Sequence, residues 1–232
     1  IYLTVDTTSD GNVETYWTGN TDSSWSMAST NFEAKSGIFA GSNQFLDGDT
    51  VIFYFFKVTD PLKRTANVTT SGSYQGIFGD YTYGSTGNVV VAEMQVLGGS
   101  KAASDTFTLK GGSILAIDSA LYSTLDQGAG KPTPSDQLVK IGDGVLVIEN
   151  ANRFFGGIHL GDASAGNSPT LAEQGGLIIL KNEYGLGDYN SMSGFQQQGL
   201  VYVHQNATID VSNITEVHNR FIVDPGKLLT LI

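Results

Sequence analysis

The feature that most constrains the fold is a series of short apolar runs, each starting at glycine, between residues 137 and 187. In residues 144–149, 156–160 and 175–181, apolar and polar side chains alternate and β-branched residues are frequent. Such runs, bounded by turn residues, are typical of β-strands. No segment between them has apolar residues at helical spacing, which excludes helical crossovers and helix bundles. The sequence therefore predicts an all-β chain of short strands joined by tight turns.

Patterns typical of strands also occur before and after this stretch. Residues 51–56 are apolar on both faces, which predicts a strand covered on both sides. After residue 199, alternation predicts a set of inward side chains that continues one elongated core. That set comprises Val201, Val203, Ile209, Val211, Ile222, Leu229 and Leu231.

Several motifs follow one another in a fixed order here. Residues 142–161 read GDGVLVIENANRFFGGIHLG, and residues 175–187 read GGLIILKNEYGLG. This order resembles the strand repeat of bacterial autotransporter passenger domains. The resemblance implies that the Gly-x-Gly strand, the Asn-Ala-Asn turn and the Gly-Gly strand are parts of the rungs of a right-handed parallel β-helix, a solenoid.

The spacing between the two Gly-Gly strands departs from that family's pattern, since it is about twice the usual length. Residues 162–173, DASAGNSPTLAE, are therefore expected to be an exposed loop inserted into one rung. Loops that project from a regular scaffold often carry contacts. The candidate ligand contacts in this insertion are Asp162, Asn167 and Glu173. A second exposed loop is expected at residues 122–136, which contain prolines and glycines.

Both tryptophans, Trp17 and Trp25, lie near the start among Asn, Asp, Ser and Gly residues. Their setting resembles the cap that precedes the strand repeats in many autotransporter-associated passengers. Bulky aromatic side chains suit such a cap because they cover exposed ladder edges and core side chains. We expect residues 1–48 to form an aromatic-rich N-terminal cap and residues 49–232 to form one continuous set of rungs. The alternative is a sugar-stacking platform, in which Trp17 and Trp25 are ligand contacts.

Composition excludes several functional classes. The absence of cysteine removes disulfides, thiol catalysis and Cys-ligated metals. The formal charge of −11 opposes binding to nucleic acid or to anionic lipid head groups. Lys57, Lys63 and Arg64 form the only near-cluster of basic residues, which we interpret as a solvated edge. No apolar run is long enough to span a bilayer, so no direct membrane insertion by this segment is expected.

A serine protease is the most serious enzymatic interpretation, because one branch of the autotransporters carries such a domain. The histidines are His159, His204 and His218, all in the predicted rungs, and the Gly-Asp-Ser-Gly nucleophile motif is absent. His159 lies between two inward residues in the alternation and is expected to point outward to water.

Metal and cofactor sites also find little support. No His-x-x-His or complete calcium-loop spacing occurs. Asp47 with Asp49, or Asp105 with nearby carbonyls, offers at most a weak calcium site, and single acids beside glycine are usually turn formers. No cofactor is expected.

The resemblance implies a passenger that is exported through the outer membrane and is displayed on the cell surface or secreted. Its expected role is adhesion, with a host-surface protein or glycan, or another passenger copy, as partner. Two alternatives remain: a polysaccharide lyase or hydrolase, and a purely structural spacer. Because the chain opens with Ile1 and stops inside an alternating run, we expect a fragment of a longer protein, with a signal sequence and a translocator barrel outside it.

Overall fold

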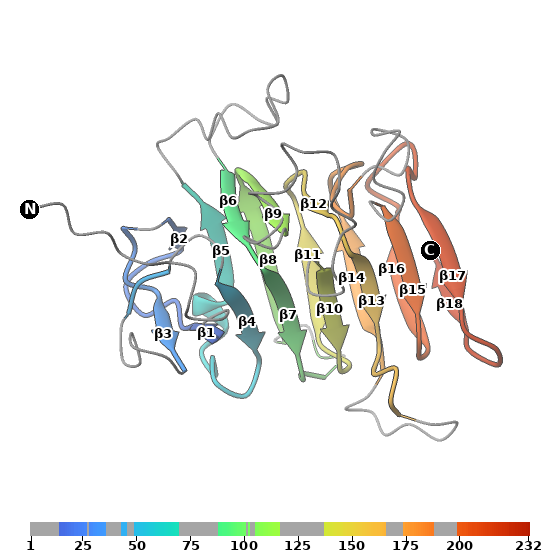
Figure 1. Cartoon of the computed structure of the whole chain (residues 1–232), viewed down its shortest axis with the longest axis horizontal. Coiled ribbons are helices and arrows are strands. Elements are labelled where there is room, and N and C mark those ends of the chain that lie inside the picture. Colours follow the sequence, from blue (N-terminus) through green and yellow to red (C-terminus); the bar gives the residue numbers. More distant parts are fainter. Residues whose placement is uncertain are drawn as a thin grey trace, which may run out of the picture.

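The computed structural model describes residues 14–26, 28–35, 43–45, 49–69, 88–100, 102, 105–116, 137–165, 174–187 and 199–232. These residues form 18 β-strands and one 3-10 helix, η1 (Pro61–Lys63), so the all-β prediction is confirmed (Figure 1). The strands are β1 (Glu14–Trp17), β2 (Ser24–Trp25), β3 (Phe32–Ala34), β4 (Thr50–Tyr54), β5 (Thr65–Val68), β6 (Asn88–Val91), β7 (Glu93–Leu97), β8 (Thr106–Gly111), β9 (Ser113–Ala116), β10 (Gln137–Ile141), β11 (Val145–Ile148), β12 (Arg153–Phe154), β13 (Gly157–Leu160), β14 (Gly176–Leu180), β15 (Leu200–Val203), β16 (Ala207–Asp210), β17 (Arg220–Val223) and β18 (Leu229–Leu231).

The strands form three sheets. Sheet A has eight strands in the order β17-β15-β13-β10-β7-β4-β1-β3, sheet B has seven in the order β18-β16-β14-β11-β8-β5-β2, and sheet C has β12-β9-β6. All pairings are parallel within the described residues, except that β1 and β3 are antiparallel. The chain passes from sheet A to sheet B and, between β5 and β13, through sheet C before it returns to sheet A. Each return adds one strand along the long axis of the molecule (Figure 1).

In-register pairing lines up equivalent side chains into columns through the stack. In one column of sheet A every member is fully buried, because each side chain packs between the equivalent side chains of the neighbouring strands. Its members are Val51, Met94, Leu138, Ile158 and Val201. A corresponding column of sheet B contains Phe107, Leu146, Ile178 and Ile209. The two columns fill the interior between sheets A and B with aliphatic and aromatic groups.

The register corrects one predicted inward residue. Phe221 pairs with buried Val201, whereas Ile222 pairs with Tyr202 on the outer face and is 38% exposed. A one-residue change of register moves a whole strand's side chains to the opposite face. Val201, Val203 and Ile209 are buried as predicted, and Val211 and Leu229 are partly buried against the core. Leu231 pairs with Ile209 but is 47% exposed, because β18 is the last strand of sheet B.

The asparagines of the Asn-Ala-Asn motif join successive turns. Asn150 Nδ2 donates to the Gly112 carbonyl over 2.6 Å. Asn152 Oδ1 accepts from the Ile114 amide over 3.0 Å, and its Nδ2 donates to the Gly185 carbonyl over 3.0 Å. Both side chains are buried, so they satisfy backbone groups that would otherwise lack partners. This motif therefore holds neighbouring turns of the chain together.

Aromatic side chains gather at the β1 end of the stack. Trp17 and Trp25 are both fully buried. The rings of Trp17 and Phe32 meet edge-on at 5.1 Å, and those of Trp25 and Phe45 are perpendicular at 5.6 Å. Trp17 Nε1 donates to the Lys63 carbonyl over 2.9 Å. Of the expected cap at residues 1–48, residues 1–13, 27, 36–42 and 46–48 lie outside the described part.

Candidate functional site

The corners at which the chain turns from sheet A to sheet B differ in length and carry buried polar groups. The corner between β10 and β11 consists of residues 142–144, and that between β15 and β16 consists of residues 204–206. The corner between β4 and β5 is longer, spans residues 55–64 and includes η1. We call the last of these the Arg64 corner, because the side chain of Arg64 organises it.

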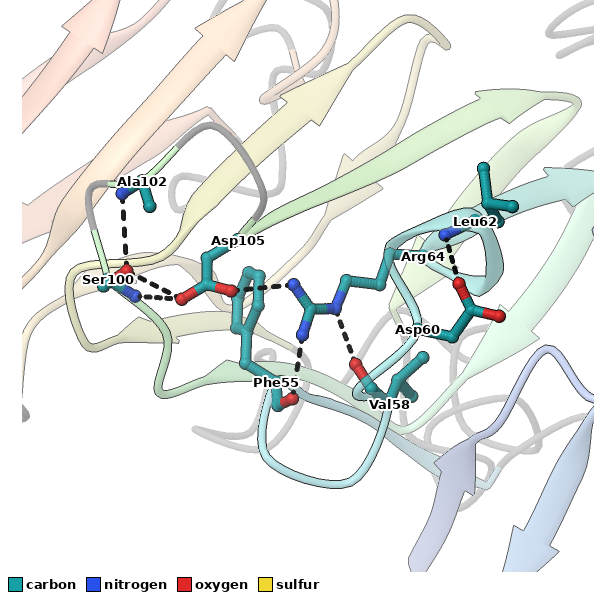
Figure 2. A network of polar contacts seen from close by, with 8 residues as sticks. All are labelled: Phe55, Val58, Asp60, Leu62, Arg64, Ser100, Ala102 and Asp105. Atoms are coloured by element: carbon teal, nitrogen blue, oxygen red, sulfur yellow. Dashed lines mark hydrogen bonds and ion pairs between the residues drawn. The ribbon is translucent and has the colours of Figure 1, made fainter.

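Arg64 is buried, with a side chain that is 5% exposed, and it holds the corner from inside (Figure 2). Its Nε donates to the Val58 carbonyl over 2.6 Å, and its Nη2 donates to the Phe55 carbonyl over 3.2 Å. Its Nη1 forms an ion pair with Asp105 Oδ1 at 2.8 Å. The planar guanidinium thus fixes two turn carbonyls and one carboxylate at once. The sequence interpretation of Arg64 as part of a solvated edge is wrong.

Asp105 links this corner to the next one along the stack. Its Oδ2 accepts hydrogen bonds from the Ser100 amide and hydroxyl, over 2.9 and 2.7 Å. These bonds, together with the Arg64 guanidinium, hold the pKa of the Asp105 carboxyl below its usual value. Asp105 therefore serves as a partner for Arg64 in a structural network.

The Arg64 corner presents two large apolar side chains to solvent. Phe56 is 68% exposed and Leu62 is 90% exposed. The Phe56 ring meets Tyr54 edge-on at 5.5 Å. Leu62 lies in η1, whose first turn is capped because Asp60 Oδ1 accepts from the Leu62 amide over 3.0 Å (Figure 2). The prediction that residues 51–56 form one strand covered on both sides is wrong at its end, since β4 stops at Tyr54 and the turn exposes Phe56.

A second polar cluster lies where β13, β15 and β17 end. His159 Nδ1 and His204 Nε2 are 2.9 Å apart, and His204 Nδ1 is 2.9 Å from Asp224 Oδ2. The His159 ring also stacks on Tyr202, with centroids 4.7 Å apart. His159 lies on the outer face of sheet A as predicted, but it is half-buried in this cluster. Its burial and the neighbouring His204 lower the pKa of His159, while a hydrogen bond with the backbone of Gly156 acts in the opposite direction.

A third corner buries a lysine. Lys140 occupies an inward position in sheet A, between Val96 and Leu160, and is fully buried. Its Nζ donates to the Gly142 carbonyl over 2.5 Å. Burial lowers the pKa of Lys140 to about 7, although the charge of Asp143 raises it. The lysine is enclosed, so we assign it to the corner's structure and not to a ligand.

Of the residues predicted as ligand contacts, the structure describes Trp17, Trp25 and Asp162, and the two tryptophan rings lie with centroids 6.4 Å apart. Trp17 and Trp25 have no exposed ring face, so this arrangement does not support the sugar-stacking alternative. Asp162 starts the predicted insertion, where its Oδ1 accepts from the Ser164 amide and hydroxyl. These bonds lower the pKa of the Asp162 carboxyl. Asn167 and Glu173, and the whole loop at residues 122–136, lie outside the described residues.

Sequence reasoning missed the exposed pair on the Arg64 corner and the paired histidines. The signal for the first was the phenylalanine pair at residues 55 and 56, directly before a segment with proline and aspartate. The histidines are 45 positions apart, and only the register of β13 against β15 places them in contact.

The described part of the chain contains no group of three or more His, Asp or Glu side chains able to hold a metal ion. Among the same residues, no helix is long and apolar enough to cross a membrane. The sequence matches no family model and no curated protein, and the fold matches no solved structure.

Proposed function

We propose that this chain is part of an autotransporter passenger, exported through the outer membrane and displayed on the cell surface or released. In this proposal the three sheets are the faces of a right-handed parallel β-helix that acts as an adhesive rod. Two features support it: the motif order of residues 142–187 and, from β4 onward, the addition of one parallel strand at each return to a sheet. A stack of this kind holds its corner loops at fixed positions along its length.

The observation that carries the adhesive function is the Arg64 corner. A loop that exposes large apolar side chains normally loses conformational entropy on binding. Here the buried guanidinium already fixes the carbonyls of Phe55 and Val58, so Phe56 and Leu62 are held in place before a partner arrives. A rigid aromatic or aliphatic anchor that fills a partner's pocket is the usual centre of binding energy in protein interfaces.

The chemistry of these two anchors favours a protein partner over a glycan. Neither Phe56 nor Leu62 offers a hydrogen bond to a sugar hydroxyl, and both fit an apolar pocket. Lys57, next to Phe56, is engaged with Glu33 at 2.8 Å and lies over the Tyr16 ring at 4.3 Å. Lys63, next to Leu62, donates to Asn20 Oδ1 over 3.2 Å. The charge of −11 repels a second copy at long range. A host-surface protein is therefore the proposed partner, and self-association is a separate outcome of the test.

The test compares two pairs of exposed apolar residues in a passenger displayed on bacterial cells. Phe56→Ala combined with Leu62→Ala should reduce adhesion to an epithelial cell monolayer about tenfold or more, because interface anchors contribute about 2 kcal/mol or more. The matched control is Leu228→Ala combined with Ile232→Ala, two side chains that are each 62% exposed in the last rung. The control pair should adhere like the wild type.

Each other outcome rejects part of the proposal. Unchanged adhesion of the Phe56 and Leu62 variant would remove the Arg64 corner as the contact site. An equal loss in the control pair would show that exposed apolar area acts without a specific site. A wild-type passenger that binds neither the monolayer nor its own copies would favour the spacer alternative.

The predicted insertion is tested separately. Gln205 Nε2 donates to the carbonyls of Asp162 and Ala165, over 3.1 and 2.8 Å. A deletion of residues 166–173 keeps these bonds and removes Asn167 and Glu173. We expect weaker adhesion with a nearly unchanged free energy of unfolding if the insertion contacts the partner. Unaltered adhesion would discard this loop.

A further inference from the structure

When both rings are neutral, the contacts from Asp224 through His204 to His159 admit a single arrangement of protons. The Asp224 carboxylate accepts hydrogen bonds only, so His204 Nδ1 carries the proton that faces it. In a neutral imidazole the other nitrogen is then an acceptor, and His204 Nε2 accepts from His159 Nδ1–H. Both 2.9 Å contacts are satisfied by two neutral rings.

One added proton is compatible with this geometry. If it resides on His204, then Nε2–H donates to His159 Nδ1, and His159 becomes the other neutral tautomer. Both contacts persist. The hydrogen bond between the two rings reverses its direction, and the positively charged ring faces Asp224. The hydrogen bond with the backbone of Gly156 favours the protonated form of His159, so that ring can also take the added proton, and both contacts persist in that case too.

A second proton is not compatible with it. Both rings then carry N–H groups on the two nitrogens that lie 2.9 Å apart, and no acceptor remains between them. Two positive rings with centroids 5.2 Å apart also repel each other. This conflict is independent of which ring takes the first proton.

The surrounding charges favour the first proton and are too few to compensate for the second. Asp162 follows β13 near His204, and Asp224 follows β17. The cations nearby are Lys227, whose Nζ donates to Gln205 Oε1 over 2.8 Å, and the exposed Arg220 of β17. The ring of Tyr202 lies against both histidine rings.

The histidine pair is directly connected to the base of the insertion. The His204 and Gln205 amides both donate to the Leu160 carbonyl, over 2.9 and 3.2 Å. Gln205 in turn holds the Asp162 and Ala165 carbonyls. Movement of His204 away from His159 therefore changes the hydrogen bonds that anchor residues 162–165.

We propose that the Asp224–His204–His159 chain is a two-proton switch, which keeps the corner closed with zero or one added proton and opens it when the second proton binds. Opening releases the hydrogen bonds from Gln205 to the Asp162 and Ala165 carbonyls. The switch responds to acidification below the ordinary histidine range of about 6.5. It is a property of the corner and does not require the adhesive function.

The test is an NMR titration of the whole chain from pH 8 to pH 4, with ring ¹⁵N shifts and backbone amide shifts recorded together. We expect two apparent steps for the pair, separated by more than about one unit, as coupled groups show. The amides of residues 160–165 and 204–206 should shift with the lower step only. His218, which stacks on Tyr184 at 4.8 Å, is the internal control for shifts that are not specific to the pair.

A His159→Gln variant provides the decisive comparison, because a glutamine amide can donate to His204 Nε2 but takes up no proton. The lower step and the amide shifts that accompany it should both disappear. Two independent histidine titrations in the wild type, without amide shifts at residues 160–165, would overturn the switch. So would amide shifts at the lower step that persist in His159→Gln. Neither result depends on adhesion.

Discussion

The Arg64 corner and the corner at residues 142–144 are each held by a buried basic side chain, an arginine in the first and a lysine in the second. Each places a buried cationic side chain inside the stack, where it donates to turn carbonyls. Arg64 has two carbonyls and the Asp105 carboxylate as partners, whereas Lys140 Nζ has the Gly142 carbonyl and lies in a column of apolar side chains. The first corner spans ten residues and exposes two apolar anchors, and the second spans three. The arginine with its counterion thus supports the long corner that exposes apolar side chains, and the enclosed lysine supports the short corner.

The two corners differ because arginine and lysine respond differently when their charged groups are removed from water. Arginine keeps its charge in proteins, so its burial requires a counterion and several acceptors. Lysine loses its proton when water is excluded, which is why burial lowers the pKa of Lys140 to about 7. The Arg64 corner should therefore be insensitive to pH near neutrality, and the Lys140 corner should not.

The largest effect is expected from the removal of Arg64. Arg64→Met leaves the Asp105 carboxylate and two carbonyls without this partner, so the unfolding free energy at pH 7 should fall by about 3–5 kcal/mol. Urea unfolding followed by circular dichroism measures it. The control is Lys181→Met, which breaks the ion pair between Lys181 and Glu149. Their side chains are 48% and 34% exposed, respectively. That change should cost at most about 1 kcal/mol, and equal losses would contradict the structural role of Arg64.

Lys140→Met should raise the unfolding free energy at acidic pH, whereas Arg64→Met should lower it. The unfolded lysine titrates near 10.5 and the folded one near 7, so between these values the unfolded state binds more protons. Wild-type stability should therefore rise as pH increases from 7 to 10.5, and below pH 7 the full penalty of a buried charge is present. The penalty is about 3.5 pKa units at about 1.4 kcal/mol each. Less the lost hydrogen bond from Nζ to Gly142, the variant should be more stable at pH 6 by about 3–4 kcal/mol. If the wild type and the variant show the same pH dependence, the buried lysine is not the cause.

A smaller effect is expected at the glycine of the same short corner. Gly142 has φ +100°, and an added Cβ would lie 2.5 Å from the Gly98 carbonyl oxygen. Gly226 has a similar backbone, φ +78°, but nothing lies within 4 Å of its added Cβ. Gly226→Ala should cost about 1 kcal/mol for the backbone alone, and Gly142→Ala about 2–3 kcal/mol because a contact is added. Comparable losses in thermal unfolding would show that corner packing is unimportant.

Local sequence pattern predicted the strands well and the polar corners poorly. The glycine-led runs correspond to β11, β13 and β14. Burial alternates along β14 as predicted, whereas all four residues of β11 are buried. Ile222 was placed on the wrong face, since the register of β17 against β15 depends on a neighbour that is distant in sequence. Arg64 looked like a surface residue for the same reason. Its counterion, Asp105, is 41 positions away and approaches it only after the strands have stacked.

The most direct test of this account is a set of distances along the outer face of sheet A. Tyr16, Ile52, Gln95, Val139, His159, Tyr202 and Ile222 form one row, in that order. Because the chain lacks cysteine, spin labels can be introduced in pairs at engineered cysteines and measured by electron–electron double resonance.

At about 4.8 Å per strand, the backbone separation from Gln95 to Ile222 should be about 19 Å, and that from Tyr16 to Ile222 about 29 Å. A difference of about 10 Å between the two label distances would support a stack that gains one parallel strand at each return. Distances that are equal, or that shorten from the first pair to the second, would contradict it.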